Sequence, residues 1–221
     1  MTKTLSGLFI AEGSSDLPLA AIVEFLFAER GRNVRLSTPN YESLQKVDKD
    51  VRSKLVAGAR LMGKPFDVAV VHRDADNAGR QARCDEIVRA VASSGVSCAL
   101  VPVIPVKMTE AWLLLDEGEI RKVAGNPNGR EDLGLPKIHE VEGLSDPKSF
   151  LRECLVRAAS VRGRKRQAAV SRFPQHRRQL LERLDLEGPV TRLSGWKSLI
   201  DDIERFIDSC SRQGSAGGRT P

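Results

Sequence analysis

The stretch Phe66-Asp67-Val68-Ala69-Val70-Val71-His72-Arg73-Asp74-Ala75-Asp76 decides the fold of this chain. Its apolar run over 66–71 predicts a strand that is buried on both faces, as in the parallel sheets of α/β proteins. Two carboxylates, Asp74 and Asp76, follow the run directly, so we expect them at the carboxyl end of that strand. In an open α/β sheet, this is the edge where ligands bind.

The segments on either side repeat a strand–helix alternation. Apolar runs predict three further strands at 5–11, 34–37 and 97–104. Helical spacing follows each strand, and the expected helices run from Ser14 or Ser15 to Gly31 and over 41–62, 79–93 and 109–116. Such alternation predicts a parallel sheet with right-handed crossovers. We therefore expect an α/β fold with a four-stranded, mainly parallel, Rossmann-like sheet flanked by helices, whose fourth strand lies at an edge because it contains Pro102.

The character of the sequence changes after Gly118. Turn-rich connections and amphipathic helices at 147–160, 173–184 and 195–210 replace the alternation. The tail 213–221 is small and polar, which is typical of disorder. The predicted organisation is a catalytic domain at 1–117, a basic helical appendage at 118–212 and a disordered tail.

Composition narrows the class of protein. The chain has 221 residues, of which 41% are apolar, and no apolar run has the length needed to cross a bilayer. The N-terminus lacks the features of a secretory signal, so we expect a cytoplasmic protein with no membrane partner. Four scattered cysteines form no CxxC pair, which argues against a zinc finger or a disulfide framework.

The net charge of +6 favours polyanionic partners. Basic residues gather in the appendage, above all in Arg162-Gly163-Arg164-Lys165-Arg166. We expect Arg162, Arg164, Lys165 and Arg166 to contact the phosphates of a nucleic acid. A solvated helix face, or a docking surface for an acidic partner, are the alternatives; aromatic residues that would read bases are not interleaved.

Acidic residues also follow the other predicted strands. Glu12 and Asp16 come after the first strand, and Glu110 comes after the fourth. Carboxylates gathered at one sheet edge would bind a hard cation such as Mg²⁺ or Mn²⁺. Acids near a helix N-terminus are also ordinary capping residues, which is the competing interpretation of Asp16 and Glu110.

Two basic side chains stand near these acids in the sequence. Lys107 could stabilise charge in a phosphoryl-transfer transition state, or it could be a solvated surface lysine. His72 precedes Asp74 by two residues and could touch the same site or serve the structure alone.

These motifs resemble the signature of the Toprim (topoisomerase–primase) domain. Glu12-Gly13 after the first strand and Asp74-Ala75-Asp76 after the third match its pattern, and the spacing of Glu12 and Asp16 is similar to that in the overcoming-lysogenization-defect (OLD) nucleases. Glu110-Ala111-Trp112 and Asp146-Pro147-Lys148 resemble a small Toprim-like family encoded beside ATPases in bacterial phage-defence loci. One departure is Ala78, which stands where the third Toprim aspartate is usual.

The resemblance implies metal-dependent cleavage of nucleic-acid phosphodiester bonds, DNA or RNA. Asp74 and Asp76 would hold Mg²⁺ or Mn²⁺, Glu12 would bind metal or act in acid–base catalysis, and Asp16 would complete a second site. The missing third aspartate weighs against primase or topoisomerase activity more than against cleavage. The chain lacks the GxxxxGK[ST] motif, so any ATP-driven step would come from a separate ATPase.

Other functions stay open at this point. The chain could be a non-catalytic regulatory or interaction subunit of an ATPase complex, with structural acids. A phosphatase of the haloacid-dehalogenase type is a poorer match, because its DxD follows the first strand. The oligomeric state, a homo-oligomer included, is also open.

Overall fold

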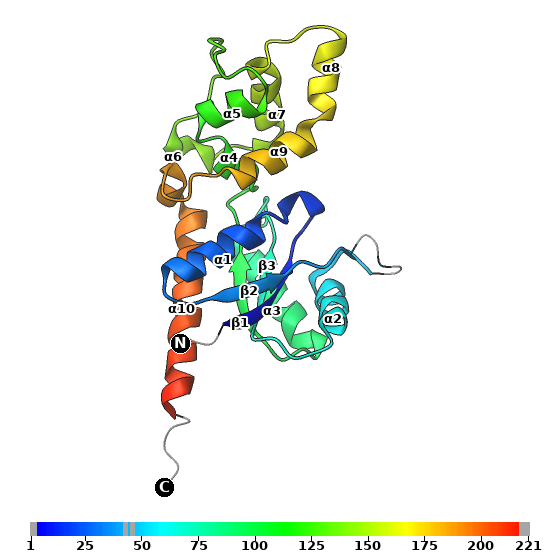
Figure 1. Ribbon diagram of the computed structural model, residues 1–221, viewed down its shortest axis with the longest axis vertical. Helices are drawn as coiled ribbons and strands as arrows, with labels where there is room; N and C mark the ends of the chain where they lie inside the picture. Colours follow the sequence, from blue (N-terminus) through cyan, green and yellow to red (C-terminus); the bar gives the residue numbers. More distant parts are fainter. Residues whose placement is uncertain (1–3, 42–43, 45–46, 217–221) are drawn as a thin grey trace. The chain divides into compact units, whose positions relative to one another are not determined.

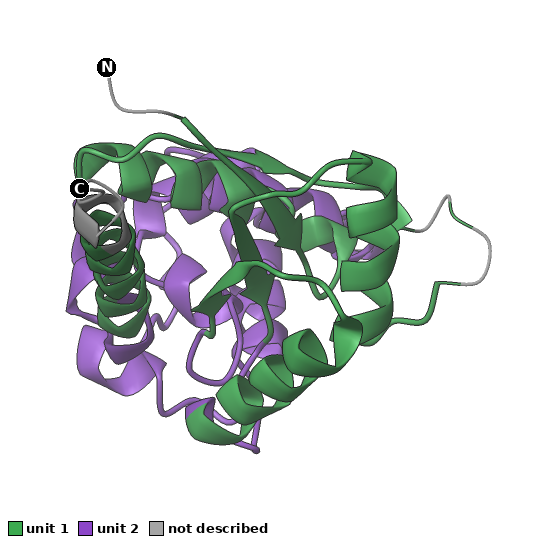
Figure 2. Ribbon diagram, turned by 90° about the horizontal axis from the view of Figure 1, so that it is seen from below, with its two compact units in different colours: residues 1–73, 81–104, 197–221 green, residues 74–80, 105–196 purple. Residues whose placement is uncertain are grey.

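The structure is a computed structural model that describes residues 4–41, 44 and 47–216. It divides into two compact units (Figure 2): unit 1 contains residues 1–73, 81–104 and 197–221, and unit 2 contains residues 74–80 and 105–196. This division differs from the expected boundary at residue 117. The segment 105–117 belongs with the helical unit, and most of the last helix belongs with the sheet.

Unit 1 contains a four-stranded, all-parallel sheet with the order β2-β1-β3-β4 (Figure 1). The strands are β1 (Leu5–Ile10), β2 (Val34–Ser37), β3 (Val68–His72) and β4 (Ala99–Val103). Every residue of β3 is buried, as its unbroken apolar run predicts. The expected α/β fold class is confirmed, and β4 lies at an edge.

Helices cover both faces of this sheet. Helix α1 (Leu19–Glu29) packs with the unit 1 part of α10 (Ser194–Ala216), where the rings of Phe27 and Phe206 meet edge to face at 5.6 Å. Helix α2 (Val51–Met62) contacts α3 (Arg80–Ser94) through a hydrogen bond of 3.1 Å from Arg52 Nε to the Ser93 carbonyl. The two pairs lie on opposite faces of the sheet (Figure 1), as right-handed crossovers require for this strand order.

Strand β1 approaches its neighbours closely at Gly7. A Cβ at this position would lie 2.5 Å from Leu36 Cδ2 and 3.0 Å from the Val68 carbonyl oxygen. A larger residue here would require Leu36 and the backbone of β3 to shift. Glycine therefore allows β1 to pair closely with both β2 and β3 at this level of the sheet.

Three expected helix boundaries are wrong. Helix α2 begins at Val51, because the Asp50 side chain caps it by accepting the Ser53 N–H at 2.9 Å. The residues at 47–50 are not helical, and 42–43 and 45–46 lie outside the described residues. The first helix begins at Leu19 after a 3₁₀ turn, η1 (Ser14–Asp16). Helix α10 continues to Ala216, into the tail expected to be disordered, and 217–221 lie outside the described residues.

Unit 2 is helical. Its core includes Trp112 and Trp196, whose rings meet edge to face at 5.1 Å. The expected helices at 147–160 and 173–184 are present as α7 and α9, and the one at 109–116 is present only as the shorter α4. Helix α6 lies in a segment expected to be irregular, and α5 and α8 were not predicted. Its helices are α4 (Glu110–Leu113), α5 (Glu117–Val123), α6 (Ile138–Val141), α7 (Pro147–Ala158), α8 (Arg164–Ser171), α9 (Phe173–Glu182) and the 3₁₀ helix η3 (Pro189–Arg192).

No helix among the described residues combines the length and apolar character needed to span a bilayer.

Candidate functional site

The acids expected at the site are divided between the two units. Glu12 and Asp16 belong to unit 1, whereas Asp74, Asp76 and Glu110, with Lys107, belong to unit 2. Each group is described within its own unit, and the convergence of all these acids on one cation stays a prediction.

The chain turns sharply after β1. Asp16 is 5% exposed, and its Oδ2 accepts the Gly13 N–H at 3.0 Å. The carboxylate therefore closes the η1 turn, which agrees with the capping interpretation of Asp16. The Nδ1 atom of His72, a fully buried residue of β3, lies 3.8 Å from the same Oδ2. His72 thus lies beside one of the predicted site acids.

Two cations that sequence reasoning missed surround Glu12. The Nε atom of Arg73 lies 3.8 Å from Glu12 Oε2, and its Nη2 lies 3.4 Å from Glu86 Oε1. Lys54, on α2, is 8% exposed and donates from Nζ to the backbone carbonyls of Ala11 at 2.8 Å and Glu12 at 2.9 Å. Burial, followed by the charge of Arg73, lowers the pKa of Lys54 from its usual range. The carboxyl end of β1 is therefore held by a buried ammonium group.

In unit 2, Asp74 is oriented by Thr109. The backbone N–H of Thr109 donates to Asp74 Oδ1 at 2.9 Å, and its hydroxyl donates to the same oxygen at 3.0 Å. Thr109 precedes α4 and is fully buried, and its side chain makes no capping hydrogen bond to that helix. The hydroxyl group of Thr109 instead holds the Asp74 carboxylate in one orientation. Fixing a carboxylate in this way is how outer-shell groups orient metal ligands.

Asp76 and Lys107 are joined by a backbone hydrogen bond, and both have a left-handed backbone conformation. The Asp76 N–H donates to the Lys107 carbonyl at 2.8 Å, and both residues have positive φ angles, 47° and 62°. A left-handed conformation at a residue other than glycine costs about 1–2 kcal/mol, and aspartate tolerates it better than lysine. The Lys107 Nζ donates to Asn77 Oδ1 at 3.0 Å. Lys107 is therefore tied to the loop that follows β3.

Glu110 has a partner that the sequence did not indicate. Its Oε1 accepts from Nε of Arg177, on α9, at 2.8 Å, and both side chains are buried. A guanidinium at this distance neutralises the carboxylate. The hypothesis that Glu110 binds a metal gains no support from this geometry, and we leave Glu110 out of the proposed ligand set.

The four basic residues expected to contact phosphates are exposed. Arg162 and Arg166 line an open cavity of about 420 Å³ together with Arg157. Two carboxylates, Glu131 and Glu153, also line it. Arg164 and Lys165 do not line this cavity, although they are exposed as well. The structure thus keeps all four side chains accessible, and phosphate contact stays a prediction.

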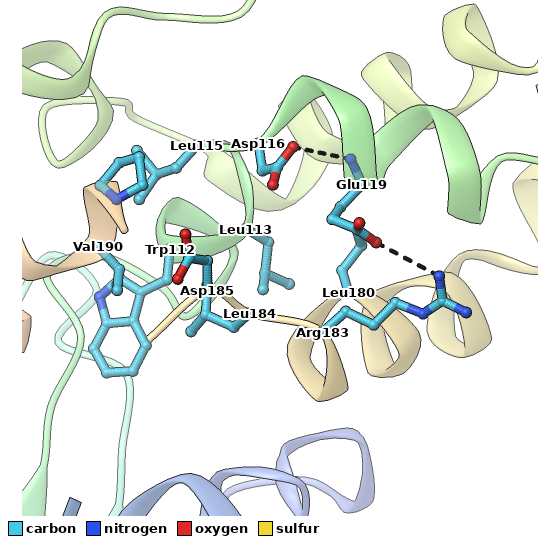
Figure 3. Close-up of a pocket in the computed structure, with 11 residues that line it drawn as sticks. Trp112, Leu113, Leu115, Asp116, Glu119, Leu180, Arg183, Leu184, Asp185 and Val190 are labelled. Carbon is cyan, nitrogen blue, oxygen red and sulfur yellow. Dashed lines mark hydrogen bonds and ion pairs between the residues drawn. The ribbon is translucent and has the colours of Figure 1, made fainter. Parts of the chain in front are cut away.

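A second cavity of unit 2 lies beside Trp112 (Figure 3) and is also lined by Leu180, Arg183 and Val190. Its volume is about 20 Å³, which is room for roughly one water molecule. The buried Trp112 Nε1 has no hydrogen-bond partner. This cavity is too small for a substrate.

The four cysteines are free, as their scattered positions predicted. Among the described residues, no group of three or more His, Cys, Asp or Glu side chains forms a ready ligand set for a metal. The donor chemistry nevertheless fits Mg²⁺, which prefers carboxylate oxygen and is commonly held by one or two carboxylates, with water and substrate phosphate completing its shell. Glu12 with Asp16, and Asp74 with Asp76, each supply such a pair.

Compared with models of protein families, with curated proteins and with solved structures, the chain matches none.

Proposed function

We propose that this chain is a Mg²⁺- or Mn²⁺-dependent Toprim-like nuclease that hydrolyses phosphodiester bonds of DNA or RNA. The observation that carries the proposal is topological. Strands β1 and β3 are parallel neighbours whose last paired residues are Ile10 and Val71, and an acidic motif follows each of them within a few residues. Ligand sites of open α/β sheets occur at this edge.

The loop after β3 adds a second argument. The backbone N–H and the hydroxyl of Thr109 both donate to one oxygen of Asp74, and Asp76 has a left-handed backbone conformation. A turn between a strand and a helix needs neither feature. Strained residues and doubly fixed carboxylates concentrate where side chains must be held ready for a ligand.

In the proposed reaction, Asp74 with Asp76 would hold one cation, and Glu12 with Asp16 would supply a second site; a bound cation supplies an activated water and neutralises charge on the phosphoryl group. Thr109 keeps Asp74 in one orientation. Lys54 fixes the backbone at Glu12. Arg162, Arg164, Lys165 and Arg166 would bind the phosphates of the strand by charge, which predicts an affinity that falls steeply with salt.

The resemblance of Glu110-Ala111-Trp112 and Asp146-Pro147-Lys148 to proteins encoded beside ATPases leads us to propose a separate ATPase as partner, with this chain as the effector of an anti-phage system. The alternative is a non-catalytic subunit of such a complex. It is favoured by the position of Arg73 beside Glu12, where an ion pair in place of a metal holds the acid.

Incubation of the purified chain with plasmid DNA and with total RNA, in Mg²⁺, Mn²⁺ or EDTA, tests the proposal. We expect cleavage that requires the divalent ion and is lost in Asp74→Asn and Glu12→Gln. Asp76→Asn is the sharpest variant, because asparagine tolerates the left-handed conformation while losing the charge. Asp201→Asn, at an exposed position of α10, is the control.

Binding of Mn²⁺, followed by electron paramagnetic resonance, supplies a readout that is independent of the substrate. If wild type and Asp74→Asn bind Mn²⁺ equally and neither cleaves, the acids are structural and the non-catalytic alternative stands.

A further inference from the structure

A cavity of unit 1 adjoins the carboxyl end of β1. Its volume is about 240 Å³, slightly below the range of ~300–1,000 Å³ that is typical of drug-sized ligands. We call it the Lys54 pocket. Its lining consists of Ala11, Glu12, Gly13, Ser14, Leu17, Pro39, Asn40, Tyr41, Val47, Lys49 and Lys54.

The pocket is positively charged. Among the described residues that line it, Lys49 and Lys54 stand against one carboxylate, Glu12, which also has Arg73 3.8 Å away. Lys54 is buried, and the carbonyls of Ala11 and Glu12 take two of the three hydrogens of its ammonium group. The third hydrogen of this buried ammonium group is available to donate to an anion bound in the pocket.

Tyr41 gives an independent indication of a ligand. Its hydroxyl is buried and has no hydrogen-bond partner, and burial raises the pKa of the phenol above its usual value. Leaving such a group unsatisfied costs about 1–3 kcal/mol. The hydroxyl lies beside Gly58 of α2, so an acceptor oxygen in the pocket would remove this cost on a small rotation of the phenol.

The rest of the lining is largely apolar. Leu17, Pro39, Val47 and the ring of Tyr41 are surfaces against which a flat, weakly polar group can pack. Small-ligand sites combine such walls with a few well-placed polar groups. An anion joined to a flat ring is the chemistry of a nucleotide.

We propose that the Lys54 pocket binds one nucleotide. Its phosphate lies against Lys54 and Lys49, one of its oxygen atoms accepts a hydrogen bond from the Tyr41 hydroxyl, and its base or sugar packs against the apolar walls. The choice of a nucleotide rests on the proposed nuclease function. The pocket then places one residue of the substrate strand beside Glu12, which also lines it. The source of the nucleotide is either a free mononucleotide or the end of a single strand.

Isothermal titration calorimetry in EDTA tests the pocket without any cleavage. The probes are inorganic phosphate, a mixture of 5′-mononucleotides and a single-stranded hexanucleotide with a 5′-phosphate. We expect nucleotide binding to weaken at least tenfold in Lys54→Met, which keeps the length of the side chain and removes its charge. Lys64→Met, at an exposed position of unit 1, is the matched control and should bind as wild type does.

Tyr41→Phe separates ligand binding from folding. Because the hydroxyl has no partner, its removal should leave thermal stability unchanged or raise it, while nucleotide binding weakens several-fold. Lys54→Met removes hydrogen bonds to the backbone and can destabilise the fold, so Tyr41→Phe keeps the proposal testable if Lys54→Met does not fold.

The outcomes distinguish this proposal from the nuclease proposal. Nucleotide binding without cleavage would keep the pocket and remove the nuclease. Cleavage with no binding to any probe in EDTA, or binding that Tyr41→Phe and Lys54→Met leave unchanged, would overturn the pocket. Tighter binding of the hexanucleotide than of mononucleotides would identify the strand as the source, and the reverse would identify a free nucleotide.

Discussion

Removal of one partner of the buried Glu110–Arg177 pair should strongly destabilise unit 2. The two side chains are 3% and 6% exposed and are joined at 2.8 Å. In Glu110→Gln the buried Arg177 loses the charge of this carboxylate, and breaking such a pair costs roughly 3–5 kcal/mol. At about 2–4 °C per kcal/mol for a chain of this size, the melting temperature should fall by roughly 6–20 °C.

Tryptophan fluorescence is the assay, because both tryptophans of the sequence, Trp112 and Trp196, lie in unit 2. The Arg178–Glu182 pair provides a matched control: it has the same separation of 2.8 Å, but its side chains are 54% and 46% exposed. Glu182→Gln should cost about 0.5 kcal/mol or less.

A loss below about 1 kcal/mol in Glu110→Gln would refute this reasoning. The double variant Glu110→Met/Arg177→Met should recover most of the lost stability, since removal of both charges leaves neither one buried alone. A metal role for Glu110 makes a different prediction, namely normal stability with loss of Mn²⁺ binding.

Three further predictions concern stability and reactivity. Asp50→Ala should lower the free energy of unfolding, measured by urea denaturation, by about 0.5–2 kcal/mol through loss of the α2 cap. Hydrogen bonds from Ser53 lower the pKa of Asp50 below 3.8. The stabilisation by the cap is therefore present above pH 3.8 and is lost as the pH falls through the pKa of the folded state. Burial raises the pKa of Cys154 to about 11, so iodoacetamide at pH 8 should modify Cys154 only in urea. Mass spectrometry measures the labelling. Modification of Cys154 in the native protein at the rate of Cys210 would contradict this prediction. Burial lowers the pKa of His176 below 6.5, so the unfolded chain binds a proton at this residue more readily, and the free energy of unfolding should fall as the pH drops through and below 6.5. The difference in free energy of unfolding between pH 7.5 and pH 5.5 should be smaller in His176→Gln than in wild type. An equal difference would show that His176 does not cause this pH dependence.

The fold could be predicted from the sequence because the strands are short apolar runs between polar turns. The expected range 34–37 agrees with β2 at both ends, and β3 and β4 begin two residues later than expected. The start of α2 could not be found from periodicity alone. Apolar spacing continues back to Tyr41, whereas the helix begins where Asp50 satisfies the first free N–H groups.

The candidate site was predictable in position and not in its contacts. Acids that follow apolar runs are visible in the sequence, and the structure places Glu12 and Asp74 just after β1 and β3. Their partners come from distant segments: Thr109 lies 35 positions from Asp74, and Lys54 lies 42 positions from Glu12. Such pairings depend on how helices pack against the sheet, which single-sequence patterns do not encode.

The strength of these partners separates the acids into two kinds. Arg73 is 3.8 Å from a Glu12 carboxylate that is 37% exposed, and a pair of this length and exposure is worth about 1 kcal/mol or less. A divalent cation can displace such a partner at little cost. The partner of Glu110 is buried at 2.8 Å, and a cation that replaced it would break a buried ion pair at a cost of several kcal/mol. A metal at the end of β1 is therefore energetically accessible in a way that one at Glu110 is not. The Mn²⁺ measurement on Glu12→Gln and Glu110→Gln compares the two directly: loss of binding in the second variant alone would reverse this order.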